Sequence, residues 1–88
     1  MISIIIKGYG QRIIALYFTE DTFLLKLYDL DLKLLKLKYI NLRINLHSIN
    51  SNEIICFSTN KSRDVRYLVL DYELNIKFSF GQSMIIFL

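Results

Sequence analysis

Two pairs of neighbouring carboxylates are the first residues whose spacing could support chemistry. Asp29 and Asp31 form one pair, and Asp71 and Glu73 form the other. Glycosidases use two carboxylates that face each other across a substrate, and calcium loops use repeated acids followed by a glycine. Both pairs, however, follow an apolar run in two similar segments, and neither turn contains a glycine. We therefore expect Asp29 and Asp71 to hold turns by accepting hydrogen bonds from the backbone.

The single histidine and the single cysteine do not form a reactive group with other residues in the sequence. Cys56 stands between Ile55 and Phe57, where a buried thiol that packs as a small apolar group is expected. His47 has no neighbouring cysteine or carboxylate that would suggest a metal site. We keep His47 as a candidate binding residue, with a structural histidine as the alternative. No catalytic residue, metal ion or cofactor is expected, and the chain is not expected to be an enzyme.

A charged break at residues 60–66 contains the other candidate binding residues, Lys61, Arg63 and Arg66. Loops on a rigid β scaffold carry binding residues disproportionately often, although a solvated loop without a ligand is the alternative. The remaining basic residues are scattered among acids, and the net charge is only +3. Nucleic-acid-binding proteins concentrate their basic residues in a patch or stripe, so no nucleic-acid partner is expected.

Length and composition describe one small domain. The chain has 88 residues, of which 53% are hydrophobic and 22% charged, which excludes a disordered tail. The apolar N-terminal stretch is too short for a signal peptide, and no uncharged window reaches the ~18 residues of a transmembrane helix. No membrane partner is expected, and a cytoplasmic location is the default.

Apolar residues recur with a period of two in the middle of the chain. The alternating residues are Leu25, Leu27, Leu30, Leu32, Leu34, Leu37, Leu42, Ile44 and Leu46. The spacing of Leu30, Leu32 and Leu34 does not fit a helix, whose apolar residues fall at i, i+3, i+4 and i+7. The pattern predicts an all-β fold of antiparallel strands joined by short turns. The expected strands are residues 2–7, 12–18, 23–28, 33–40, 43–49, 53–58, 66–71 and 75–80.

These strands divide into two similar groups of four. Residues 12–16 match residues 53–57 at an offset of 41, and residues 25–29 match residues 67–71 at an offset of 42. The sequence thus predicts a first blade-like repeat at residues 1–41 and a second at residues 42–83. Residues 84–88 are expected to open a further strand. A unit of ~40–45 residues with four antiparallel strands is typical of a β-propeller blade.

The chain resembles, over nearly its whole length, the blades of β-propeller repeat proteins, particularly the NHL-like, six-bladed type, and in both repeats an aspartate (Asp29, Asp71) ends the third strand. The resemblance rests on the segment 52–58, the segment 67–75 with Asp71 ending its strand, and the closing segment 76–82. It implies two adjacent blades of an incomplete propeller. It also implies that the first strand of each blade lines a central channel, where ligands such as one near His47 are bound.

From this resemblance we expect a non-catalytic scaffold for protein or ligand binding, as a fragment of a longer propeller. Its partners are then further blades of the same or a longer chain, or another protein. Self-association of a two-blade unit is a further possibility, because two blades do not close a ring. Part of a propeller-fold hydrolase or lyase, and a fragment of a membrane β-barrel, are the alternative functions.

Overall fold

The computed structural model describes residues 2–59 and 64–83, and every regular element in these residues is a β-strand. The strands are β1 (Ser3–Tyr9), β2 (Arg12–Phe18), β3 (Phe23–Tyr28), β4 (Leu34–Ile40), β5 (Asn45–Ile49), β6 (Ile54–Thr59), β7 (Asp64–Leu70) and β8 (Ile76–Ser83). The all-β class predicted from the period of two is confirmed. The expected opening strand at residues 84–88 lies outside the described residues.

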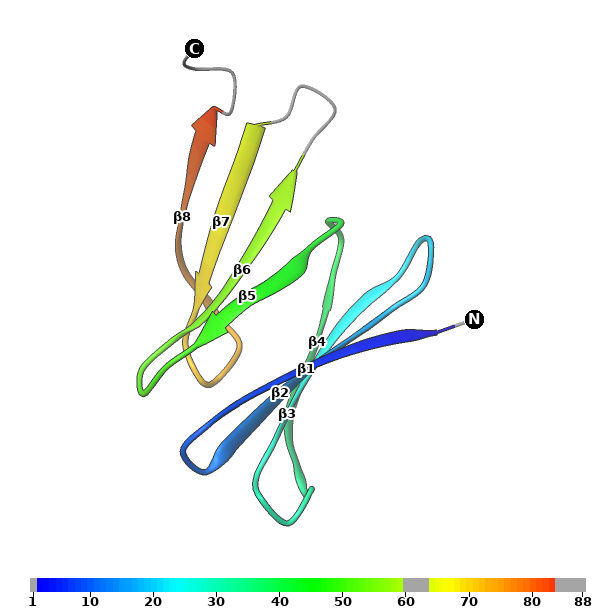
Figure 1. Ribbon diagram of the computed structural model, residues 1–88, viewed down its shortest axis with the longest axis vertical. Coiled ribbons are helices and arrows are strands. Elements are labelled where there is room, and N and C mark those ends of the chain that lie inside the picture. The colour runs from blue at the N-terminus through cyan, green and yellow to red at the C-terminus, as the bar shows by residue number, and fades with distance from the viewer. Residues whose placement is uncertain (1, 60–63, 84–88) are drawn as a thin grey trace.

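The strands form two open antiparallel sheets of four strands each, in the orders β1-β2-β3-β4 and β5-β6-β7-β8 (Figure 1). We call them the first sheet and the second sheet. Each is a meander, as predicted, because every strand pairs with the strand that follows it along the chain. The turn between β1 and β2 is tight, and Gly10 adopts a φ of +58° there, a conformation in which a side chain would be strained.

The pairing register of the second, third and fourth strands is the same in the two sheets. Ile13 lies opposite Tyr28 in the first sheet, and Ile54 lies opposite Leu70 in the second. Both sheets also shift register near the start of their last strand, at Tyr28 opposite Leu34 and at Leu70 opposite Ile76. Positions in β2 and β6 therefore correspond at an offset of 41 residues, and those in the last two strands of each sheet at 42.

The turns that follow β3 and β7 are also alike. The Oδ1 atom of Asp29 accepts hydrogen bonds from the backbone N–H groups of Asp31 and Lys33, both at 2.9 Å. The Oδ1 atom of Asp71 accepts the corresponding bonds from Glu73 and Asn75, again at 2.9 Å. The carboxylates thus hold the turns as predicted, because a short acidic side chain can bond the backbone two to four residues ahead.

A single hydrophobic core fills the space between the two sheets. Along β2, β3, β6 and β7 it takes alternate residues, as expected for half-buried strands, and β4 and β5 add one residue each. The buried members of the first sheet are Ile14, Leu16, Phe23, Leu25, Leu27 and Ile40; those that follow along the chain are Ile44, Leu46, Ile54, Cys56, Leu68, Leu70 and Leu74. We call the two sides that face this core the core faces. We call the opposite sides the first outer face and the second outer face.

The sheets approach each other through the first strands and through one turn. Strand β5 lies against β1 and, less extensively, β2, and Figure 1 shows β8 on the far side of the second sheet. The turn after β7 reaches β4, where Glu73 Oε2 lies 2.8 Å from Lys36 Nζ. The hydrogen bond and the charge of Glu73 raise the pKa of Lys36. Because both side chains are exposed, this ion pair adds little stability.

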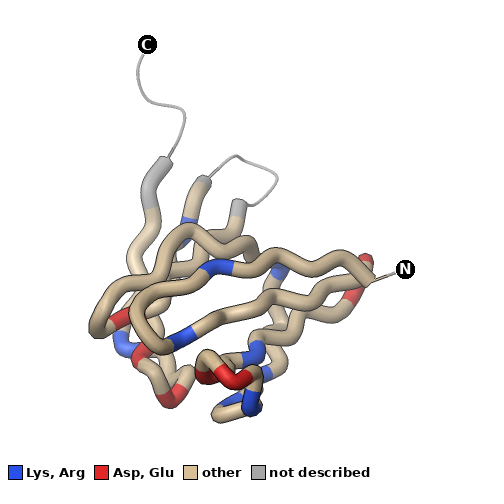
Figure 2. The backbone as a smooth tube through the Cα atoms, turned by 60° about the horizontal axis from the view of Figure 1, so that its bottom comes forward, with Lys and Arg blue, Asp and Glu red and all other residues tan. Residues whose placement is uncertain are grey.

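Charged residues are interspersed by sign along the chain (Figure 2). Acidic residues lie at or near the turns, and basic residues lie both near the turns and along the strands. The described residues therefore present no continuous basic stripe of the kind that tracks a nucleic-acid backbone.

Candidate functional site

The structure places two of the four candidate binding residues, because Lys61 and Arg63 lie outside the described residues. Arg66, expected at the end of the charged break and at the start of the strand 66–71, belongs to β7, which begins at Asp64 and pairs with β8 as far as Ser83. Pairing with β8 thus starts the strand two residues before its expected first residue, so the charged break is shorter than its polar sequence suggested. The guanidinium Nη1 of Arg66 is exposed and donates to Ser79 Oγ at 3.4 Å.

His47 lies at an irregularity of β5. The register shifts between Leu46 and Ser48, so His47 is the extra residue of a β-bulge. The Nδ1 atom of its exposed ring lies 3.1 Å from Ser48 Oγ. It also meets two aromatic rings edge-on, with centroids 6.3 Å from Phe57 and 5.8 Å from Tyr67. A bulge redirects a side chain, and here it turns the imidazole toward the aromatic residues of the neighbouring strands.

Arg66 and His47 do not form one site. Arg66 alternates with Tyr67 along β7 and shares the side of Leu68 and Leu70, which belong to the core. His47 contacts Tyr67, on the opposite side of the same sheet. The two candidates therefore lie on opposite faces of the second sheet.

An aromatic row crosses the second outer face. Its members are His47, Phe57, Tyr67, Phe78 and Phe80, one or two from each strand of the sheet. Neighbouring ring centroids are 6.3 Å (His47–Phe57), 6.4 Å (Phe57–Tyr67), 5.1 Å (Tyr67–Phe80) and 6.2 Å (Phe78–Phe80) apart. Phe78 and Phe80 remain 51% and 48% exposed. Aromatic residues that are stacked yet open to solvent form a ready contact surface.

The sequence analysis did not single out the aromatic row. The parity of the residues could have revealed it, because Phe57 follows the buried Cys56 and must point to the other side of its strand. Phe78 and Phe80 flank Ser79 in the same way, and their ladder partners Val69 and Tyr67 identify the face that they share.

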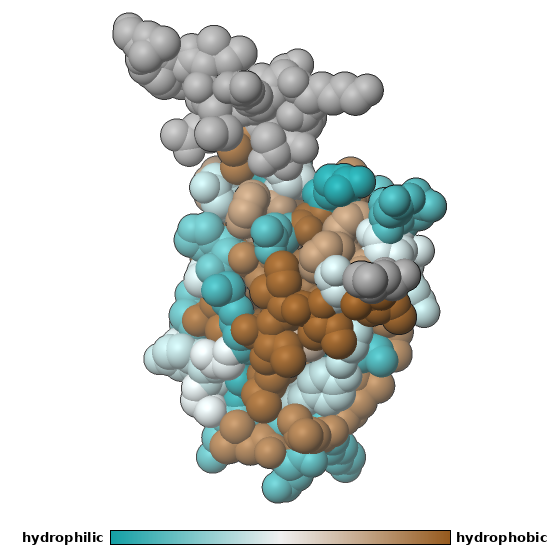
Figure 3. Space-filling model, turned by 45° about the vertical axis from the view of Figure 1, so that its right-hand side comes forward, coloured by the Kyte–Doolittle hydropathy of each residue, from teal (hydrophilic) through white to brown (hydrophobic). Residues whose placement is uncertain are grey.

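The first outer face is also apolar. Ile4, Ile6, Leu37 and Tyr39 are between 50% and 67% exposed. Figure 3 views the molecule from the side of the first sheet and shows hydrophobic side chains gathered across its middle, with hydrophilic ones around them. A contiguous exposed patch of this kind is typical of an interaction site rather than of an isolated small domain.

Two tyrosines and a lysine form the polar part of this face. The hydroxyl oxygens of Tyr17 and Tyr28 are hydrogen-bonded at 2.9 Å. This bond, together with burial, raises the pKa of Tyr28 from 10.0 to about 12. The ammonium of Lys26 lies 4.8 Å from the centre of the Tyr17 ring, a cation–π contact.

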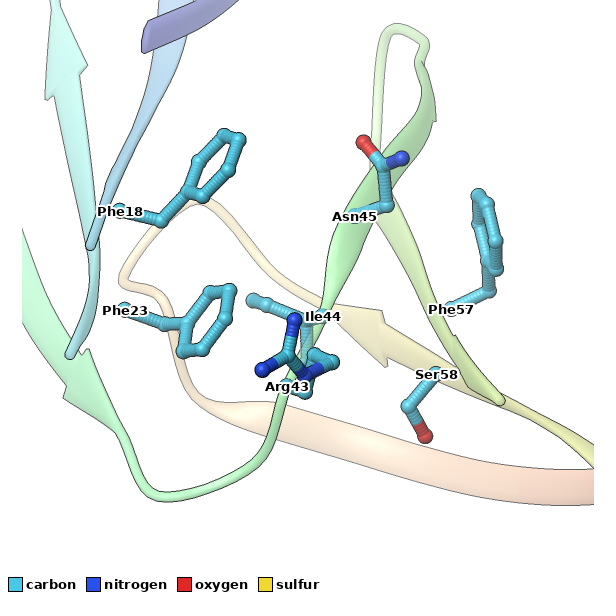
Figure 4. Close-up of a pocket in the computed structure, with 7 residues that line it drawn as sticks. All are labelled: Phe18, Phe23, Arg43, Ile44, Asn45, Phe57 and Ser58. Atoms are coloured by element: carbon cyan, nitrogen blue, oxygen red, sulfur yellow. The ribbon is translucent and has the colours of Figure 1, made fainter. Parts of the chain in front are cut away.

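An open hollow lies between the sheets, where the chain enters the second one (Figure 4). Its volume is about 240 Å³, and its lining residues are Phe18, Phe23, Arg43, Ile44, Asn45, Phe57 and Ser58. The rings of Phe18 and Phe23 stack at 5.8 Å on one side, and the Arg43 guanidinium lies 5.9 Å from the Phe23 ring. The lining offers apolar contact and one cation but no carboxylate, histidine or thiol. It can hold an apolar group, but it provides no acid–base pair for catalysis.

Among the described residues, the potentially reactive side chains are either buried or too far apart to act together. Cys56 is fully buried, and burial raises its pKa to about 12, so its thiol is not activated. Within residues 2–59 and 64–83, no three histidine, cysteine or carboxylate side chains gather as metal ligands. The same residues contain no helix long and apolar enough to cross a membrane.

The fold and its surfaces define an all-β protein of two packed four-stranded sheets, each with an apolar outer face. No protein-family model, curated protein or solved structure matches the chain.

Proposed function

We propose that the chain is a non-catalytic β-propeller segment, formed by two adjacent blades, that acts as a scaffold for protein binding. Its outer faces are the binding surfaces, and their partners are further blades of the same or another chain. The observation that carries the proposal is that each outer face corresponds, position by position, to a core face of the other sheet.

The correspondence follows from the shared register. Ile14 and Leu27, which are opposite each other on the core face of the first sheet, correspond to Ile55 and Val69 on the second outer face. In the other direction, the core residues Cys56 and Leu68 correspond to Ala15 and Lys26 on the first outer face. Each outer face therefore has the same positions as a core face that already packs inside the molecule. A third sheet added on either side would repeat the existing contact.

Two further features support the proposal. The first strands β1 and β5 lie together, as expected for strands next to the axis of a propeller. The exposed side chains Ile6 and Tyr39 on one outer face and Phe78 on the other are about half or more accessible to solvent. Covering such groups contributes roughly 25 cal/mol per Å² of apolar surface, so both faces would gain from a partner sheet.

A tandem protein tests the proposal. Two copies of the full chain are joined head to tail by a flexible Gly/Ser linker of ~10 residues, which gives an effective concentration near the millimolar range. Unfolding in urea is compared with that of the single chain, at a concentration low enough for the single chain to be monomeric. If the outer faces pack against blades, the new contact raises the unfolding midpoint of the tandem.

The control variants separate this contact from a general effect of linkage. Phe78→Glu with Phe80→Ala in the leading copy should return the midpoint to that of the single chain. Leu42→Lys changes an equally exposed leucine in the connection between the sheets, at 48% exposure, and should leave the increase intact. A tandem that unfolds at the midpoint of the single chain would overturn the proposal.

A further inference from the structure

The two outer faces of one chain also fit each other. We infer that a second copy of this chain is a partner of the scaffold: the second outer face of one copy packs against the first outer face of the next. This inference rests on the proposed function, since it assumes that outer faces pack as core faces do. It goes further by naming the partner and the orientation of the contact.

The internal contact between the sheets is the template. There, Leu74 in the turn after β7 is 1% exposed and belongs to the core, and Glu73 beside it pairs with Lys36. The corresponding turn of the first sheet has the same hydrogen bonds at Asp29, but its leucine, Leu32, is 69% exposed. In a head-to-tail contact, Leu32 of one copy takes the role toward its neighbour that Leu74 has toward the first sheet.

The two outer faces carry complementary side chains at positions where they differ from the corresponding core faces. Lys26 on the first outer face corresponds to the buried Leu68, and it points to the side on which the preceding copy would lie. In the internal contact, the core face with Leu68 packs against the core face with Leu25. Tyr67 of the aromatic row corresponds to Leu25, so Lys26 would meet the aromatic row. A lysine ammonium over tyrosine or phenylalanine rings is a favourable pairing, more so when water is excluded.

A second departure makes the contact between copies more apolar than the internal one. Phe78 and Phe80 stand at the positions of Lys36 and Lys38, so the ion pair between Lys36 and Glu73 has no counterpart there. Two partly exposed aromatic side chains replace two lysines, and aromatic side chains contribute most to protein interfaces.

The contact is heterologous, because each copy uses a different face on each side. Successive copies therefore add in the same way, and they give a ring if the rotation closes or an open chain if it does not. An isologous dimer, by contrast, would bury two first outer faces or two second outer faces against each other. This difference can be tested with two variants that each block one face.

The first-face variant carries Leu37→Lys and Tyr39→Lys, at positions 50% and 67% exposed. The second-face variant carries Phe78→Glu and Phe80→Ala, because a glutamate at the position of Lys36 would lie opposite Asp31, the counterpart of Glu73, and alanine removes the second ring. Leu42→Lys is the matched control outside both faces. Circular dichroism and the protection of Cys56 from thiol reagents verify that each variant is folded.

The masses of these proteins are measured by light scattering over a range of concentrations, each alone and in equimolar mixture. The unmodified chain and Leu42→Lys are expected to exceed the monomer mass of 10.4 kDa increasingly with concentration. Each double variant alone should show a dissociation constant weakened about tenfold or more and remain monomeric. Their mixture should form a one-to-one dimer, because each supplies the face that the other lacks.

Three results would overturn the inference: an unmodified chain that is folded and monomeric throughout, a double variant that still associates by itself, or a mixture that stays monomeric. The first of these, combined with a stabilised tandem, would leave the proposed scaffold function standing and remove only the second copy as partner. The failure of both experiments would remove the proposed function as well.

Discussion

Leu32 and Leu74 occupy the same position in equivalent turns, and they differ almost completely in exposure. Both have a φ of 63°, and both donate a backbone hydrogen bond to the aspartate three residues earlier, at 3.1 and 3.0 Å. Leu74 is 1% exposed because the first sheet covers it, whereas Leu32 is 69% exposed. The local structure of the turn is therefore independent of burial. A neighbouring sheet would change the exposure of Leu32 and leave the conformation of its turn as it is.

Truncating these two leucines should have very different effects on stability. Leu74→Ala removes buried side-chain atoms from the core and is expected to lower the free energy of unfolding by about 2–4 kcal/mol. Leu32→Ala keeps the same backbone strain and removes only exposed atoms, so a change within about 0.5 kcal/mol is expected for the monomer. Urea denaturation of both variants checks this. Equal losses would show that Leu74 is not in the core.

The turn aspartates should be replaceable by asparagine but not by alanine. Asp71→Ala removes an acceptor of two backbone hydrogen bonds and is expected to cost about 1–2 kcal/mol of stability. Asp71→Asn keeps the Oδ1 acceptor and should cost much less, because the turn needs the oxygen rather than its charge. Thermal unfolding of the two variants separates these roles. An asparagine variant as unstable as the alanine variant would contradict this account of the turn.

The tyrosine pair on the first outer face should give a high-pH transition. The pKa of Tyr28 is raised to about 12 by its hydrogen bond with Tyr17 and by burial, against 10.0 in the unfolded chain. A raised pKa means that the folded state holds the proton more tightly, so this stabilisation is complete below pH 10 and is lost between about pH 10 and 12.

Ultraviolet titration of the phenols measures this directly. Tyr17→Phe removes the hydrogen bond and should shift the Tyr28 transition toward its ordinary value near 10. Tyr39→Phe, which changes an exposed tyrosine of the same face, is the matched control and should leave the late transition in place. A titration in which Tyr17→Phe has no effect would exclude the hydrogen bond as its cause.

Cys56 should react with thiol reagents only when the protein unfolds. It is 0% exposed, and burial raises its pKa to about 12, so neither access nor thiolate is available in the folded state. Labelling at pH 8 should therefore follow the rate of opening rather than the rate of the chemical reaction, and urea should accelerate it steeply. Rapid labelling without denaturant would place Cys56 outside the core.

The sequence was sufficient to predict the strands and their turns, because both depend on local patterns. Alternation of apolar and polar residues around Leu25 and Leu27 indicated strands despite a composition rich in leucine and lysine. Asp29 and Asp71 were predicted to hold turns, since their side chains bond their own backbone. The pairing of successive strands followed from the short connections between them.

The candidate binding surface was harder to predict, because it depends on which side of each sheet is covered. Alternation alone does not distinguish the core face from an apolar outer face when both sides carry large side chains, as around Phe57. The bulge at His47 also cannot be read from its neighbours, since it arises from pairing with β6. The strand that contains Arg66 was expected to begin at that residue because the stretch before it is polar, whereas ladder partners in β8 extend the strand to Asp64.

We expect an additional sheet to cover Leu32 as the first sheet covers Leu74. The most direct test is nuclear magnetic resonance of the leucine methyl groups in the tandem protein, with a soluble paramagnetic probe and only one copy labelled at a time. Leu74 should be protected in both copies. Leu32 should be accessible in the leading copy and protected in the following copy, whose first outer face meets the leading copy. Equal accessibility of Leu32 in the two copies would contradict the account.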